Sequence, residues 1–456
     1  MEIFVVLVFV LGYVAITMEH TFKLDKLIPA LLMMVLAWTG VAFGLDGFTN
    51  WFDSHAGKML EGFSGMLHEE RLHLLEGTLL HHFGKTAEIL VFLIGAMTIV
   101  EIIDHFDAFS TIKSFVKTNK KRTLLWIVCI LGFLLSAIID NLTATIVLIT
   151  ILRKLLPEAK DRMWYAGLII IAANAGGAWS PIGDVTTTML WMGKKVTAGM
   201  LMEYLVIPSV LCLIVPLLAA SFLPAFKGTF ESVKDDEKEN KHSKLMFYLG
   251  LGLIVFVPVF KTITHLPPYV GMMLSLAIIS MVAELITNRK FNITNVADEM
   301  EQPSESAHHH TSPTFRALSR IELPSILFFL GILMTVAALE TLGLIFNFGQ
   351  LVQASMNNEV FILILGAASA VIDNVPLVAA SMGMYDMTQF PIDDHVWHFI
   401  AYAAGTGGSM LIIGSAAGVV AMGMEKISFF WYLKNIAGLA LIGYLAGFGF
   451  MMLLHS

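Results

Sequence analysis

Two short polar motifs interrupt otherwise apolar stretches of this 456-residue chain. The first motif consists of Ser136, Asp140, Asn141 and Thr143, and the second of Ser369, Asp373 and Asn374. The serine and the aspartate recur in the second motif at one and the same sequence offset, as in a duplicated half. An ionisable side chain at the centre of a bilayer costs roughly 2.5–3.5 kcal/mol on insertion scales. Because both motifs carry an aspartate at this cost, we expect them to form a functional site.

A second pair of motifs rich in glycine interrupts two further apolar stretches. The first of these contains Asn174, Gly177, Gly183, Asp184 and Thr186, and the second contains Gly405, Gly408, Ser409 and Gly414. Gly177 and Gly183 have the same spacing as Gly408 and Gly414, and the offset between the two pairs is close to that of the polar motifs. Glycine and proline allow a helix to unwind, and unwound backbone at membrane depth is tolerated where it is buried or lines a cavity.

All four motifs together supply hard oxygen donors, which suit a hard cation and disfavour a soft one. The candidate residues are Ser136, Asp140, Asn141, Thr143, Asn174, Asp184, Thr186, Ser369, Asp373, Asn374 and Ser409. Glu101, late in a predicted helix, is a further candidate carrier of a proton if it faces inward. No lysine or arginine occurs in these motifs, so we expect a net negative cavity that favours a cation over an anion.

Buried carboxyl groups near one another favour the protonated form, so each can hold either a proton or a cation such as Na⁺. Competition between the two for the same carboxyl group is a sufficient mechanism for exchange. Structural roles stay open for these residues. Asp140 or Asp373 could only cap the helix that follows, Ser136 and Ser369 could only bond back to their own helices, and Asp184 could be structural.

The composition identifies a multi-pass membrane protein. Hydrophobic residues make up 57% of the chain and charged residues 14%, which leaves too little polar surface for a soluble globule of this length. The net charge of −8 is spread over short loops and argues against a nucleic-acid partner. The start of the chain has no basic flank and no small-residue cleavage site, so we expect a membrane helix there.

Apolar runs of sufficient length predict ten membrane crossings. Eight are continuous, at 3–19, 26–44, 87–104, 199–226, 245–263, 268–287, 321–345 and 428–454, and two are interrupted, at about 161–194 and 397–424. We expect residues 44–86 to form a long linker with several histidines and an interfacial helix at 67–82. A histidine metal site there is disfavoured because no tight ligand spacing recurs.

Basic residues predict the topology. They flank both ends of the stretch 123–153, which is too short for two crossings and is therefore expected to be a re-entrant hairpin entering from the cytoplasm. Acidic residues follow the stretch 358–382, which is expected to be a hairpin entering from outside. These features predict an all-α protein built as an inverted repeat, with halves at 1–226 and 245–456 joined by a charged linker at 227–244.

These motifs resemble those of the NhaD-type sodium/proton antiporters of the ion transporter superfamily. The matching features are the two Asp-Asn hairpin tips and the Asn174 to Asp184 break. The resemblance implies a Na⁺ or Li⁺/H⁺ antiporter without cofactor that serves pH homeostasis, with Na⁺ at Asp140, Asn141, Asp373 and Asn374. It also implies five crossings and one hairpin per half, a homodimer, elevator-like movement and a location in a bacterial inner membrane.

Two alternatives remain. An anion or metalloid permease of the same superfamily would carry a dicarboxylate or arsenite, although dicarboxylate relatives have serine in place of aspartate at the hairpin tips. An intramembrane aspartyl protease would also use two membrane aspartates, but Gly183 and Asp184 lack the Gly-x-Gly-Asp context. We therefore expect a transporter rather than an enzyme.

Overall fold

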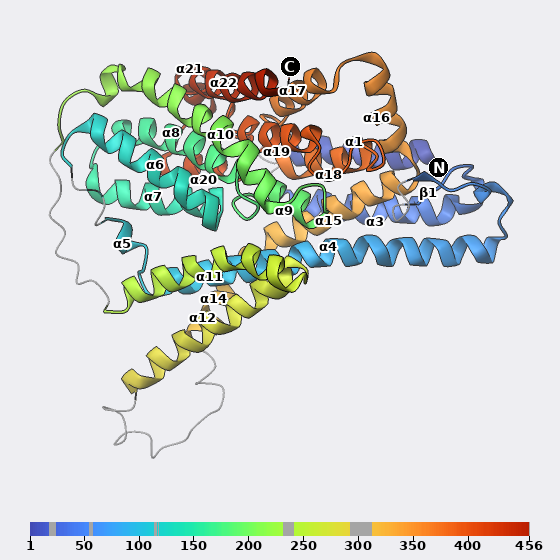
Figure 1. Cartoon of the computed structure of the whole chain (residues 1–456), viewed down its shortest axis with the longest axis horizontal. Helices are drawn as coiled ribbons and strands as arrows, with labels where there is room; N and C mark the ends of the chain where they lie inside the picture. Colours follow the sequence, from blue (N-terminus) through green and yellow to red (C-terminus); the bar gives the residue numbers. More distant parts are fainter. Residues whose placement is uncertain are drawn as a thin grey trace.

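The computed structural model describes residues 1–17, 24–53, 58–113, 116, 118–230, 241–291 and 312–455. These residues are almost entirely helical (Figure 1). Among them, eight helices are long and apolar enough to cross a membrane. The prediction of an all-α multi-pass membrane protein is therefore confirmed. Most of the predicted linker 227–244 lies outside the described residues.

The described residues of the first part of the chain form a series of α-helices and one small hairpin of strands. The helices are α1 (Glu2–Thr17), α3 (Leu27–Gly44), α4 (His68–His105), α5 (Ser110–Lys113), α6 (Lys121–Ile139), α7 (Asn141–Leu155), α8 (Ala159–Ala178), α9 (Val185–Met192) and α10 (Ala198–Ser221). The strands β1 (Phe52–Asp53) and β2 (Lys58–Met59) pair antiparallel, and short 3₁₀ turns lie at Leu45–Gly47, Phe63–Gly65 and Pro224–Phe226.

The second part repeats this order of long helices, a hairpin and an interrupted helix. Its helices are α11 (Ser243–Thr264), α12 (Pro268–Phe291), α14 (Pro313–Arg320), α15 (Leu323–Thr341), α16 (Leu344–Ser355), α17 (Asn358–Ala368), α18 (Asn374–Met384), α19 (His395–Gly407), α20 (Ala416–Glu425), α21 (Phe429–Asn435) and α22 (Ala437–His455). Helices α14 and α16 are not anticipated by the sequence patterns.

The helix expected at 67–82 is present, but the prediction of a linker between it and the crossing at 87–104 is wrong. α4 runs without a break for 38 residues, from the stretch expected at the interface into the predicted crossing 87–104. It runs along the length of the molecule in Figure 1, with α11 and α12 packed against it and α12 extending below it. Straight-chain residues, leucines and glutamates dominate its first turns and favour a helix. The apolar run therefore extends an existing helix rather than starting one.

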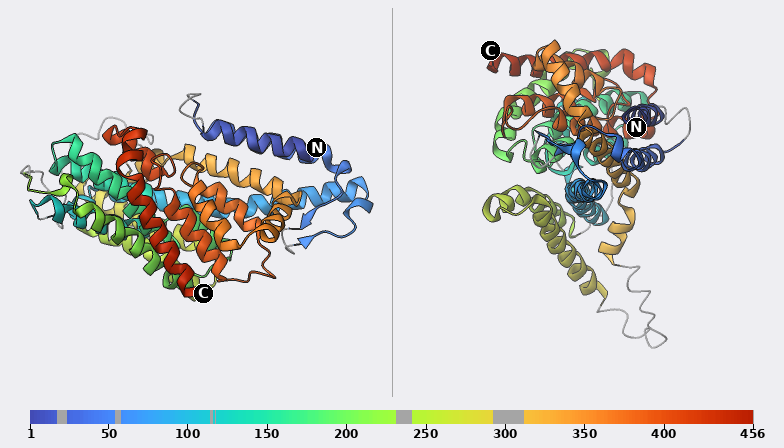
Figure 2. Two further views of the ribbon diagram at one scale, coloured as in Figure 1. Left: turned by 90° about the horizontal axis from the view of Figure 1, so that it is seen from above. Right: turned by 90° about the vertical axis from the view of Figure 1, so that its right-hand side faces the viewer.

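Two helical segments are interrupted, one between α8 and α9 and the other between α19 and α20. Pairs of long helices surround these two interrupted helices. α3 packs along α15, α10 packs along α22, and α1 lies outside α3 at the margin of the molecule (Figure 2). α6 and α7 pack against each other and on α8, and we call this pair hairpin 1. The consecutive helices α17 and α18 both pack on α19, and we call this pair hairpin 2. Hairpin 1 lies toward the left-hand end of the molecule in Figure 1, and hairpin 2 lies nearer its middle.

Glycines let the interrupted helices approach the hairpins closely. A Cβ atom on Gly183 would lie 2.6 Å from the carbonyl oxygen of Ser136, and one on Gly414 would lie 2.6 Å from that of Ala370. Each of these glycines therefore allows a break to sit against the backbone of a hairpin. The same close approach occurs in both parts of the chain.

We expect Gly183→Ala to destabilise the protein by about 1–3 kcal/mol, the usual range for overpacking, because its methyl group meets backbone that cannot move aside. The matched control is Gly252→Ala in α11, where a Cβ atom meets nothing within 4 Å. That change removes a flexible residue from a helix and should leave stability equal or higher. Thermal unfolding of the purified variants in detergent measures both. Equal melting temperatures for the two variants would contradict the packing at Gly183.

Candidate functional site

The tip of hairpin 1 is the single residue Asp140. It stands between α6 and α7 with a φ of 106°, a backbone conformation that residues other than glycine rarely adopt. Its carboxylate accepts hydrogen bonds from the backbone nitrogen of Thr143 at 2.7 Å and from the Thr143 hydroxyl at 2.8 Å. Asp140 thus caps α7. Capping uses only part of a carboxylate, which offers about four acceptor positions.

The tip of hairpin 2 carries Asp373 at the start of α18. One carboxylate oxygen accepts from the backbone nitrogen of Val375 at 3.3 Å, and the other accepts from the ammonium group of Lys26 at 3.2 Å. Lys26 lies just before α3, outside all four polar motifs. The site is therefore less negative than the motifs alone predict.

Asp184 joins the two hairpin tips. One of its oxygens accepts from the backbone nitrogen and the hydroxyl of Thr186, both at 2.9 Å, so Asp184 caps α9. The other oxygen accepts from the amide of Asn141 at 2.9 Å and from the amide of Asn374 at 3.5 Å. Asp184 is only 4% exposed. One buried carboxylate thus holds side chains from both of the repeated motifs.

Asn174 extends this network to the second interrupted helix. Its side-chain oxygen accepts from Asn141 at 3.1 Å, and its amide nitrogen donates to the hydroxyl of Ser415 at 3.0 Å. Ser415 caps α20, as Asp184 caps α9, and the offset between these two caps equals that between the glycine-rich motifs. Sequence reasoning missed Ser415, although the offset between the repeated motifs pointed to it.

A cavity of about 120 Å³ lies where these groups meet. Its polar lining consists of Lys26, Asp140, Asn141, Thr143, Asp184, Thr188, Glu322, Ser325, Asp373 and Asn374. The remaining lining is mostly apolar and includes Phe92, Met97 and Phe329. Carboxylate and amide oxygens dominate the polar donors, and they suit a hard cation.

Other predicted residues support the site from outside the cavity lining. The hydroxyl of Ser136 donates to the carbonyl of Ala173 at 2.6 Å, and that of Ser369 donates to the carbonyl of Ala404 at 3.1 Å. Each bond fastens one hairpin to the neighbouring interrupted helix. The sequence left open whether these serines bond to their own helices. In the structure each serine bonds to a neighbouring interrupted helix instead.

Besides the two serines, four predicted residues are absent from the cavity lining: Asn174, Thr186, Ser409 and Glu101. Thr186 binds Asp184, as described above. Ser409 donates to the carbonyl of Thr406 at 2.5 Å and is buried. Glu101 lies near the end of α4, where it interacts electrostatically with Asp104 and Arg320. Among the described residues there is no cluster of three histidine, cysteine or acidic side chains suited to a metal, and His55 of the histidine-rich stretch lies outside them.

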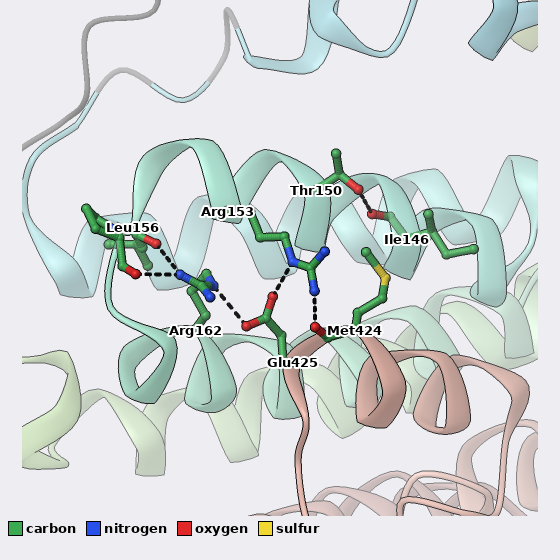
Figure 3. Close-up of polar contacts among 8 residues, drawn as sticks. Ile146, Thr150, Arg153, Leu156, Arg162, Met424 and Glu425 are labelled. Atoms are coloured by element: carbon green, nitrogen blue, oxygen red, sulfur yellow. Dashed lines mark hydrogen bonds and ion pairs between the residues drawn. The ribbon is translucent and has the colours of Figure 1, made fainter.

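A cluster of ion pairs around the buried Glu425 holds hairpin 1 at the end away from its tip (Figure 3). Glu425, the last residue of α20, accepts from Arg153 of α7 at 2.7 Å and from Arg162 of α8 at 2.8 Å. Arg153 also donates to the carbonyl of Met424, and Arg162 to that of Leu156. An acidic group at a helix C-terminus is unfavourable by itself, and the two arginines offset it. The cluster ties hairpin 1 to both interrupted helices.

Membrane-length helices, two interrupted helices and two hairpins around one central cavity define a multi-pass membrane transporter. The family model for citrate transporters, CitMHS, matches residues 13–398, and the chain belongs to this family. It is a transporter rather than an enzyme, as the sequence predicts.

Similar proteins carry sodium/proton antiporter names. Sodium/proton antiporter 1 of Arabidopsis thaliana is 40% identical over 100% of this chain and 73% of its own length. Na(+)/H(+) antiporter NhaD of Vibrio cholerae is 30% identical over 98% of this chain and 91% of its own length. The predicted NhaD-type resemblance is confirmed. The YdaH transporter of Alcanivorax borkumensis shares the fold, with a TM-score of 0.61, 14% identity and coverage of 93% of this chain and 98% of that chain.

The Glu425 cluster predicts a graded loss of stability. The Arg162 side chain is 15% exposed and that of Arg153 is 44% exposed, against 1% for Glu425. Arg162→Gln leaves a buried carboxylate half paired and should cost about 3 kcal/mol, whereas Arg153→Gln should cost at most about 1 kcal/mol. Thermal unfolding in detergent ranks the two variants. A larger loss for Arg153→Gln would contradict the arrangement.

Proposed function

We propose that this protein is a sodium/proton antiporter in which Na⁺ and H⁺ compete for the carboxylates of the central cavity. The observation that carries the proposal is the convergence of both hairpin tips on Asp184. Asn141 and Asn374 bind the same oxygen of Asp184, while Asp140 and Asp373 line the same cavity. The names of the similar proteins support the same function.

The charge of the cavity supports a cation as cargo. Asp140, Asp184, Asp373 and Glu322 line it, against the single ammonium group of Lys26 among the described lining residues. A carboxylate that leaves water loses its hydration, and either a proton or a bound cation restores the balance. Na⁺ and H⁺ are therefore alternatives at one site, and the arrival of one releases the other.

The amide groups decide how a cation is held. In the present arrangement the amides of Asn141 and Asn374 donate to Asp184, and their carbonyl oxygens remain as acceptors. We propose that Na⁺ is held by Asp140, Asn141, Asp373 and Asn374, with Asp184 as an additional carboxylate. Li⁺ has the same charge and the same preference for oxygen, so it is proposed as an alternative cargo.

Equivalent contacts in the two parts of the chain support an inverted repeat with halves at 1–226 and 245–456. Each hairpin serine donates to a carbonyl of the neighbouring interrupted helix. The helix after each interruption begins with a capping side chain, which is Asp184 for α9 and Ser415 for α20. Movement of the hairpins with these helices would expose the cavity to either side in turn. The homodimer and the elevator-like movement stay predictions.

The host membrane also stays a prediction. The named relatives come from a plant and from a bacterium, and we propose a bacterial inner membrane for this protein. Cation exchange there would contribute to pH homeostasis.

The transport activity is tested with proteoliposomes that contain only this protein and an imposed pH difference. Addition of Na⁺ or Li⁺ should dissipate the difference, and K⁺ should have no effect. No response to Na⁺ or Li⁺, combined with uptake of citrate or arsenite, would contradict the proposal and favour the anion or metalloid permease.

We expect Asp184→Asn, Asp140→Asn and Asp373→Asn each to reduce exchange by about ten- to a hundredfold. A lost bond to a charged group is worth about 1.5–3 kcal/mol, which corresponds to that range. The matched control is Asp161→Asn, which removes a carboxylate that pairs with Lys121 at 2.5 Å outside the cavity. It should retain wild-type exchange. Wild-type exchange in all three cavity variants would contradict the assignment.

A further inference from the structure

Lys26 occupies a position that helix stability does not explain. It is the N-cap residue of α3, where its ammonium group, which has donors and no acceptor, cannot cap a backbone nitrogen. The partial positive charge at a helix N-terminus disfavours a cation there. Asp25 instead accepts from the backbone nitrogen of Leu27 at 2.9 Å. The position of the Lys26 ammonium group therefore needs another cause.

That cause is Asp373, which belongs to the other part of the chain. The Lys26 ammonium nitrogen is 3.2 Å from a carboxylate oxygen of Asp373 and 4.5 Å from the ring centroid of Phe328. The side chains of Lys26 and Asp373 are 31% and 23% exposed. Both residues line the central cavity, so the ion pair lies inside the site.

We propose that Lys26 is a tethered competitor for the transported cation: its ammonium group occupies Asp373, and Na⁺ binds there only when that group withdraws. The inference rests on the proposed function. An ammonium group and Na⁺ carry the same single charge, and both bind a carboxylate oxygen. The same oxygen of Asp373 cannot serve both fully at once.

Tethering makes the competition effective. A group attached to the chain near its target acts at an effective concentration in the millimolar range, which raises the concentration of free cation needed to displace it. The ammonium group also returns to Asp373 when the cargo leaves. This return avoids an unpaired carboxylate, which is costly in a site of low dielectric constant. Lys26 thus weakens binding and assists release.

The other charged groups of the site do not provide an equivalent competitor. Asp140, Asp184 and Glu322 face the same cavity and are acidic, and Asp25 lies beside Lys26 on the chain. Among the described residues that line the cavity, Lys26 is the one base. A single substitution therefore removes the proposed competitor.

The test compares Na⁺ KM and Vmax for wild-type protein and Lys26→Gln in proteoliposomes at one pH. We expect the Na⁺ KM to fall about two- to fivefold, the range for a partly exposed ion pair, with no rise in Vmax. Lys26→Arg retains the cation and should keep a KM close to wild type. The matched control is Lys261→Gln, whose ammonium group lies 4.4 Å from the ring centroid of Trp191 outside the cavity and which should leave the KM unchanged.

A double-substitution cycle separates competition from a structural role. In an Asp373→Asn background, adding Lys26→Gln should leave the Na⁺ KM unchanged, because the pair is already lost. An unchanged or higher KM in Lys26→Gln, with wild-type protein active, would overturn the inference. Absence of Na⁺-dependent exchange in wild-type protein would instead overturn the proposed function. If Lys26→Gln does not accumulate, Lys26→Met, which removes the charge and keeps a long unbranched side chain, replaces it.

Discussion

The structure depends on one constraint: polar groups deep in a membrane protein must find partners within the protein, because the bilayer provides none. Breaking two helices and folding two hairpins exposes backbone nitrogens at the new helix starts. Asp140, Asp184, Asp373 and Ser415 each accept from such a nitrogen, so the capping residues are also the polar groups of the site. The same side chains therefore satisfy the exposed backbone nitrogens and provide polar groups for the site.

The remaining architecture holds these ends together. Glycines at the breaks permit backbone contact with the hairpins, and the serines of both hairpins add one hydrogen bond each to the interrupted helices. Glu425 and its two arginines fix hairpin 1 at its far end, where α7, α8 and α20 meet. Hairpin 2 is held differently, because Lys26, directly before α3, forms an ion pair with Asp373 at its tip. The two parts of the chain therefore share a plan but differ in the ties that restrain them.

Local and repeated features were predictable from the sequence. An aspartate followed by asparagine in an apolar run indicates a helix start, and the recurrence of both motifs at nearly the same offset indicates that two such starts belong together. Lys26 with Asp373 and Glu425 with Arg153 and Arg162 were not predictable, because each pair joins segments far apart in the sequence with no local pattern. The continuity of α4 was missed because its first turns are polar and resemble a linker.

Competition between proton and cation for the cavity carboxylates is the central claim, and proton release on binding tests it most directly. Purified protein in weakly buffered detergent solution is mixed with Na⁺, and the pH change is followed with K⁺ as the reference. We expect proton release that saturates with Na⁺, is absent with K⁺ and is lost in Asp184→Asn. Saturable Na⁺ binding without release of protons at any pH would contradict it.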